Sequence, residues 1–306
     1  RRIIMANTTF SGPIRSENGM KLVSKNTTSG LISDRTVGDY PKDARRWYLE
    51  EWFNRRPGLN ANLDQASTVE VQRTLNYDWE VAGTNMTSAL VTFGATTGGI
   101  LATTAGADQD QAIIYPHLDN DGTADTGAIT AWSGVQWGTE NETHWETSIM
   151  LPAIDNQKVF CGLKLTGTAN GQLVVTDDDQ AYFKFQTDAT NSEAFTDFTK
   201  WHFVHSIGGT DYISQLPITV AANTPYHLKI KIDSDRKASI FVNGEQYNVT
   251  TTSGSTGGTA VTKGTTPTAA LTNDVDFIPY NGIEAGDGAA EALNTHFIAM
   301  SRLVYE

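Results

Sequence analysis

Carboxylate side chains are the groups of this chain that could carry out hydrolytic chemistry. Glycoside hydrolysis needs two carboxylates that face each other across a cleft, as a Glu-x-Asp-x-x-Glu pattern on one strand would supply. The chain contains no such pattern. Glu146 stands alone in HWETSIM, where we expect it on the solvent face of a strand, and Asp177 to Asp179 form a like-charge run typical of a solvated turn. We therefore predict no catalytic residue and no enzyme, and a glycoside hydrolase is the least favoured function.

A second group of carboxylates could bind a metal ion. The segment LDNDGTADTG places Asp119, Asp121 and Asp125 around a glycine, and oxygen ligands on a tight turn suit calcium. No glutamate closes the loop at the spacing of an EF-hand, so a turn without metal is the alternative. His202 and His205 should not form a ligand pair, because residues three apart on a strand point to opposite faces. Calcium is thus the one cofactor that the sequence suggests.

Aromatic side chains could bind a saccharide. In ITAWSGVQWGTENETHW, Trp132 and Trp137 lie near Asn141, and aromatic rings can cover sugar faces while an amide binds hydroxyl groups. Tryptophan rings in a sandwich are often core residues, so ordinary packing is the other interpretation. The segment has no regular period that would show which face each ring takes.

Strands must position all of these groups. YHLKIKID alternates strictly, with apolar residues on one face and His227, Lys229 and Lys231 on the other. The dipeptide Asn243-Gly244 just after it is a strong hairpin signal. Similar short segments occur at residues 90–93, 111–115, 144–151, 159–165, 180–185, 200–205, 275–280 and 296–304. These features predict an all-β fold, a β-sandwich or jelly roll over residues 66–306.

One helix and one long loop should interrupt this pattern. YPKDARRWYLEEWFNRRPG predicts a helix over about residues 41–56, because Pro41 suits a first helical turn and Pro57-Gly58 ends it. Its aromatic residues recur at i,i+4 spacing and need burial, either against the sandwich or in a subunit interface. The interface would consist of Trp47, Tyr48, Trp52 and Phe53. The low-complexity residues 251–270 predict a long exposed loop.

The first 65 residues combine that helix with an extended arm that has few apolar side chains. The chain has a net charge of −13, but residues 1–75 hold 12 Lys/Arg against 8 Asp/Glu. A basic arm on an acidic body favours an acidic partner for the arm and disfavours nucleic acid. No run of eighteen apolar residues occurs, so we expect no membrane span. Met5 is typical of a start, no signal peptide is expected, and Cys161 alone forms no intrachain disulfide.

Several segments resemble a known family. WETSIM, GLKLTG, DDDQAYFKFQTD and YHLKIKIDSDRKASIFVNGEQ look like parts of a concanavalin A-like (laminin-G-like) jelly roll over roughly residues 76–306. The opening MANTTFSGPIRSENGMKLVSKNTTSG is similar to the start of structural proteins encoded by marine tailed phages. The combination resembles phage virion proteins, more specifically capsid decoration proteins.

This resemblance implies a non-enzymatic structural protein on the outer capsid surface, bound to the lattice of the major capsid protein. The arm would anchor it by adding a strand to an exposed sheet edge. The anchoring residues would be Phe10, Pro13, Ile14, Arg15 and Lys21. We expect a homo-oligomer, for example a trimer. The alternative is a glycan-binding module of a head or tail fibre that contacts the host surface.

Overall fold

The computed structural model describes residues 23–25, 32–34, 46–53, 79–94, 98–116, 128–129, 137–164, 167–168, 179–187 and 195–304. Strands dominate these residues, and the helical elements among them are short 3-10 turns at Ser88–Leu90 and Thr139–Asn141. The predicted all-β sandwich is confirmed. Within the described residues no helix is long and apolar enough to cross a membrane.

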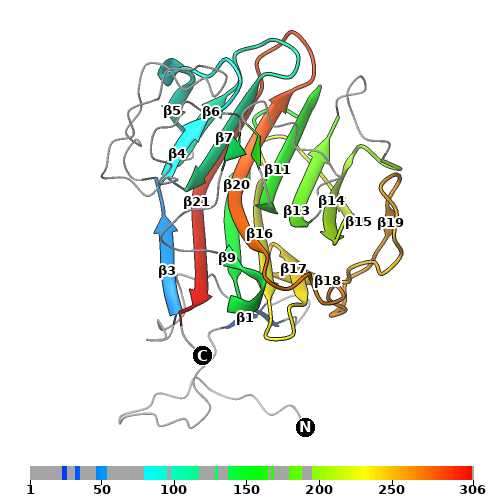
Figure 1. Cartoon of the computed structure of the whole chain (residues 1–306). Helices are drawn as coiled ribbons and strands as arrows, with labels where there is room; N and C mark the ends of the chain where they lie inside the picture. Colours follow the sequence, from blue (N-terminus) through cyan, green and yellow to red (C-terminus); the bar gives the residue numbers. More distant parts are fainter. Residues whose placement is uncertain are drawn as a thin grey trace, which may run out of the picture.

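Two large sheets pack face to face (Figure 1). The eight-stranded sheet has the order β18-β17-β16-β10-β21-β6-β5, and β3 also pairs with β21. Its strands are β3 (Arg46–Glu51), β5 (Val91–Phe93), β6 (Ile100–Thr103), β10 (His144–Met150), β16 (Pro225–Ile232), β17 (Ala238–Val242), β18 (Glu245–Tyr247) and β21 (Ala292–Leu303). Long-range antiparallel pairing of this kind places the last strand, β21, near the centre of the sheet.

The nine-stranded sheet has the order β19-β15-β14-β13-β11-β20-β7-β4, with β9 also paired to β20. Its strands are β4 (Trp79–Ala82), β7 (Gln111–Pro116), β9 (Trp137–Gly138), β11 (Gln157–Lys164), β13 (Gln180–Gln186), β14 (Lys200–Ile207), β15 (Thr210–Thr219), β19 (Thr259–Ala260) and β20 (Asp276–Ala285). All eight strand segments predicted from local sequence overlap strands of these two sheets.

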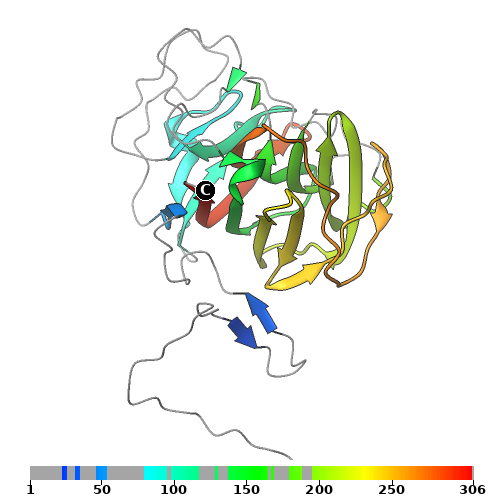
Figure 2. The same cartoon turned by 60° about the horizontal axis from the view of Figure 1, so that its bottom comes forward.

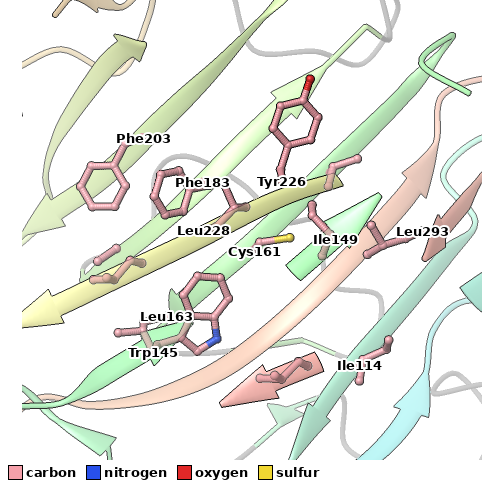
Figure 3. Close-up of a cluster of buried hydrophobic side chains, with 14 of the residues drawn as sticks. Ile114, Trp145, Ile149, Cys161, Leu163, Phe183, Phe203, Tyr226, Leu228 and Leu293 are labelled. Carbon is pink, nitrogen blue, oxygen red and sulfur yellow. The ribbon is translucent and has the colours of Figure 1, made fainter. Parts of the chain in front are cut away.

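The main core lies between the sheets. Alternate residues of each strand face it, so Trp145 and Leu228 from one sheet meet Cys161 and Phe183 from the other (Figure 3). Each of these side chains is fully buried. Burial raises the pKa of the Cys161 thiol, which stays protonated inside the core. The apolar half of the alternation in the sequence is therefore the packed interior.

The hairpin predicted at Asn243-Gly244 is confirmed. β17 and β18 are joined by these two residues, whose φ angles are 51° and 80°. Positive φ at both central positions is what a tight type I′ turn requires.

The helix predicted over residues 41–56 is wrong where the structure describes it, because Arg46–Glu51 forms strand β3. The segment satisfies two periods at once: the i,i+4 aromatic spacing of a helix and a strand alternation. Leu49 faces the core and Trp47 packs on Trp137 with ring centroids 5.2 Å apart, whereas Tyr48 packs on the opposite face of the sheet. The segment forms a strand because it pairs with β21, and the local sequence contains no sign of that pairing.

Two small sheets lie outside the large ones. β1 (Val23–Lys25) pairs with β2 (Ile32–Asp34), and β8 (Ala128–Ile129) pairs with β12 (Gly167–Thr168). Figure 2 shows the β1–β2 hairpin in blue, apart from the sandwich. Residues 251–270 form the predicted loop, which is largely exposed and includes β19.

Candidate functional site

The outer face of the eight-stranded sheet carries an exposed aromatic side chain in a polar setting. Trp52 follows β3 and is 47% exposed. Its ring stacks on Phe297 of β21, with centroids 4.7 Å apart and an interplanar angle of 27°. The His227 ring of β16 also packs on Phe297, at 5.7 Å. Because Phe297 is itself buried, it holds the exposed indole in a fixed place.

A β-bulge brings hydrogen-bonding groups to this place. Ser148 of β10 is opposite Phe297, whereas its neighbour Ile149 is opposite Thr295, so His296 is the extra residue of β21. Ser148 Oγ lies 3.1 Å from His296 Nδ1. Burial lowers the pKa of His296, so its ring is neutral at pH 7, with Nδ1 facing Ser148 Oγ and Nε2 buried. We call Trp52, Phe297, His227, Ser148 and His296 the aromatic platform.

Glu146 lies on the same strand as Ser148 and is fully buried, so the expectation that it faces solvent is wrong. Its Oε2 is 3.4 Å from Lys229 Nζ and 3.6 Å from His227 Nε2. Both basic residues come from β16, the strand paired with β10. A buried carboxylate beside basic groups has the counter-charge that it needs. This arrangement supports the sheet and is not the facing carboxylate pair of a glycoside hydrolase.

The outer face of the nine-stranded sheet is polar and aromatic although it is buried. β11 and β13 are buried along their whole length. Their inward residues belong to the main core, while Phe160 and Tyr182 belong to a separate cluster on the other side of the sheet. We call that outer side the polar face. Its residues on four adjacent strands are Lys158, Phe160, Gly162, Lys164, Gln180, Tyr182, Lys184, Gln186, His202, Val204, Ser206, Asp211, Ile213 and Gln215.

Charged groups on the polar face are closely surrounded. Lys158 Nζ lies 2.6 Å from Glu284 Oε1, and Gln111 Nε2 donates to Glu284 Oε2 at 2.7 Å. The Lys184 ammonium lies 4.9 Å from the centre of the Phe160 ring, which is a favourable cation–π distance. Burying these ions costs solvation free energy, which the contacts with Glu284 and with the Phe160 ring offset in part.

His202 and His205 lie on opposite faces of β14, as the sequence predicts. His202 belongs to the polar face and its ring lies 4.1 Å from that of Phe195. His205 stacks on Tyr212 at 4.6 Å and on Phe203 of the main core at 5.7 Å. Burial is the main cause that lowers their pKa values, to about 4 for His202 and about 3 for His205. Both rings are therefore neutral at pH 7.

We expect the free energy of unfolding to fall as the pH drops from about 6.5 towards 4. In this range the unfolded histidines bind protons and the native ones do not, so the unfolded state is favoured by about 1.4 kcal/mol per pH unit for each histidine. His205→Phe keeps a ring against Tyr212 and removes the titrating group. The free energy of unfolding, measured with urea at several pH values, should therefore fall less steeply towards low pH for this variant than for the wild type. The same pH dependence in the variant and the wild type would show that His205 titrates normally in the native protein.

The other residues singled out in the sequence fall into three groups. Phe10, Pro13, Ile14, Arg15, Lys21, Asp119, Asp121, Asp125 and Trp132 lie outside the described residues. Trp137 is buried in the core and has no ring face to offer a sugar, while Asn141 is half-buried at the end of a 3-10 turn. Of the four aromatic residues assigned to an interface, Trp52 alone is exposed, and Phe53 is buried.

Sequence reasoning did not find Ser148, His296 or Phe297 as candidate site residues. The alternation in HWETSIM could have placed Ser148 on an outward face. No local signal indicates the bulge at His296, because a bulge is defined by the pairing of two strands, and His296 lies 148 positions after Ser148 in the chain.

No protein-family model and no curated protein matches the chain. Solved structures with a similar fold include the β-glucanase of Bacillus licheniformis, with 13% identity, TM-score 0.43 and coverage of 85% of this chain and 99% of that one. Carbohydrate-binding module CBM66 of Bacillus subtilis has 10% identity, TM-score 0.35 and coverage of 71% and 93%. The carbohydrate recognition domain of Emp46p has 8% identity, TM-score 0.44 and coverage of 79% and 98%.

Proposed function

We propose that this protein is a non-enzymatic, saccharide-binding β-sandwich whose aromatic platform contacts the glycan. The observation that carries the proposal is the exposed Trp52 ring, held against Phe297 beside hydrogen-bonding side chains. A saccharide presents apolar C–H faces, which pack on an aromatic ring, and hydroxyl groups, which need donors and acceptors. Ser148, His227 and His296 lie around Phe297, the ring on which Trp52 stacks, and would supply those groups.

Two other exposed aromatic side chains show what distinguishes Trp52. Phe93 is 46% exposed and Phe198 is 38% exposed. Within the described residues, Trp52 has an aromatic ring beneath it and imidazole groups near that ring, and the structure records no ring stacked on either phenylalanine. Isolated exposed apolar residues are ordinary on protein surfaces, whereas a rigid ring among polar groups fits a ligand-binding site.

Trp52→Ala should weaken glycan binding at least about tenfold, which corresponds to a loss of about 1.4 kcal/mol. The measurement is binding of fluorescent protein to an array of bacterial cell-surface polysaccharides, followed by calorimetry on those that bind. Phe93→Ala is the matched control, because it removes an equally exposed ring from the same sheet. Equal affinity of Trp52→Ala and wild type for every bound polysaccharide would refute the role of the platform.

A second candidate function is attachment to a phage capsid through the N-terminal arm. It is supported by one observation: β1 and β2 form a sheet of their own and join neither large sheet (Figure 2). A segment that adds nothing to the sandwich is available for a contact elsewhere.

Deletion of residues 5–40 should abolish sedimentation of the protein with purified capsids and leave the Tm of the sandwich within about 2 °C of the full chain. The small change in Tm follows because β1 and β2 pair with each other and with no strand of the sandwich. Capsid binding that survives the deletion would rule out the arm as the anchor.

A further inference from the structure

The polar face contains two neighbouring side chains with buried polar atoms that lack a well-formed hydrogen bond in the described residues. His202 is completely buried, and its ring has the Lys200 backbone beside it but no well-formed hydrogen bond within the described residues. Gln215 lies opposite His202 on β15, and its Oε1 is also buried without a partner in the described part of the chain. Buried polar groups without partners cost free energy, and proteins retain them where another state or a ligand satisfies them.

A small cover lies on these two residues. The Phe195 ring packs on the His202 ring at 4.1 Å, and Lys184 Nζ lies 5.3 Å from the Phe195 centroid. Gly258 lies beside both residues, since a Cβ placed on it would be 3.3 Å from His202 Cδ2 and 3.6 Å from Gln215 Cβ. Phe195 forms a β-bridge with Gly257. The Phe195 ring and Gly257-Gly258 therefore cover His202 and Gln215 on the outer side of the sheet.

The cover has features of a segment that can move as a unit. Thr196 N–H donates to Gly257 O at 3.0 Å, so a hydrogen bond holds its two parts to each other. Gly257 and Gly258 have φ angles of 84° and 127°, which side chains other than glycine rarely adopt. Residues 251–256 before them are exposed, and β19 after them is fixed by pairing with β15. The glycine pair lies between two attachments to β15, the hydrogen bond from Gly254 N–H to Asp211 O at 2.8 Å and the pairing of β19, so any movement of the cover turns on the two glycines.

We infer that Phe195, Gly257 and Gly258 are a displaceable cover over a second saccharide site, formed by His202, Gln215 and Lys184. The inference rests on the proposed function, because it assigns the same ligand class to the opposite sheet. The imidazole and the amide would bind sugar hydroxyl groups, and the Lys184 ammonium, which lies over the fully buried Phe160 ring, would donate to further sugar oxygens. The Phe195 ring occupies the position of the ligand when the site is closed. The measured affinity is then reduced by the fraction of molecules that are open.

The test uses the full chain with Trp52→Ala already present, so that the aromatic platform does not contribute. Adding Phe195→Ala removes the ring that closes the site, and we expect an increase of about tenfold in affinity for polysaccharides of the same array. Adding Gln215→Leu to that double variant should remove the gain, because it deletes a hydrogen-bonding group of the site. Phe195→Val, which removes the ring but keeps a small apolar side chain, is the second opening variant if Phe195→Ala lowers the Tm strongly.

The outcomes separate the two proposals. No gain from either Phe195 variant, with the fold intact by circular dichroism, overturns the covered site and leaves the platform untouched. A gain that Gln215→Leu does not reverse also overturns it, since the ligand would then bind elsewhere. If Trp52→Ala alone has no effect but the Phe195 variants still raise affinity, the platform fails and the covered site stands.

Discussion

Replacing Glu284 with leucine is expected to lower the free energy of unfolding by about 3–5 kcal/mol. The side chains of Lys158 and Glu284 are 8% and 2% exposed, and their charged atoms lie 2.6 Å apart. The variant removes the carboxylate and leaves the ammonium buried beside an apolar group, which costs more than the pair itself contributed. Gln111 loses its acceptor as well. Urea unfolding at pH 7 gives the change directly, provided that the m-value is unchanged.

An exposed ion pair provides the matched control. Lys200 Nζ and Asp197 Oδ2 are 2.9 Å apart, with each side chain 29% exposed. Solvent screens this pair, so Asp197→Asn should cost no more than about 1 kcal/mol. The double variant Lys158→Met with Glu284→Leu should recover most of the stability, since neither charge of the pair remains. If Glu284→Leu costs as little as Asp197→Asn, Lys158 reaches water, and the polar face is more open than its burial indicates.

The strands of the sandwich could be predicted because their signals are local. Alternation in residues 226–233 shows which side chains face the core, and Asn243-Gly244 marks the turn that follows. β15 has a weaker signal, since Pro217 interrupts it. Pro217 lies where the register between β14 and β15 shifts, a position at which a strand tolerates proline.

β3 shows why a local signal can mislead. RWYLEE places aromatic residues at helical spacing and also alternates as a strand does. The choice depends on a free edge of β21, which is about 250 positions further along the chain. The sequence consequently predicts a helix at Trp52, although its ring stacks on Phe297 of strand β21.

The polar face could not be predicted for a different reason. Alternation divides β11 and β13 into an apolar and a polar half, and a polar half normally faces water. Here both halves are buried, so Lys158, Lys184 and His202 lie in a low-dielectric environment rather than in solvent. Burial of the second face is a property of the whole chain, and the sequence of one strand contains no sign of it.

Gly162→Ala is expected to destabilise the protein by about 3 kcal/mol, a large effect for one methyl group. A Cβ at Gly162 would lie 2.5 Å from Tyr182 Cα and 2.6 Å from Ala181 O, which are backbone atoms of the neighbouring strand. The φ angle of 154° adds strain for a residue with a side chain. β11 is paired on both sides, so neither strand can move away without breaking hydrogen bonds.

Gly288→Ala is the control, because nothing lies within 4 Å of a Cβ placed there. Its effect on urea unfolding should stay within about 0.5 kcal/mol. A similarly small effect of Gly162→Ala would mean that β11 and β13 lie further apart than described. Lys184 and His202 would then not align with Phe160 in one row, and the covered saccharide site would lose the geometry on which it depends.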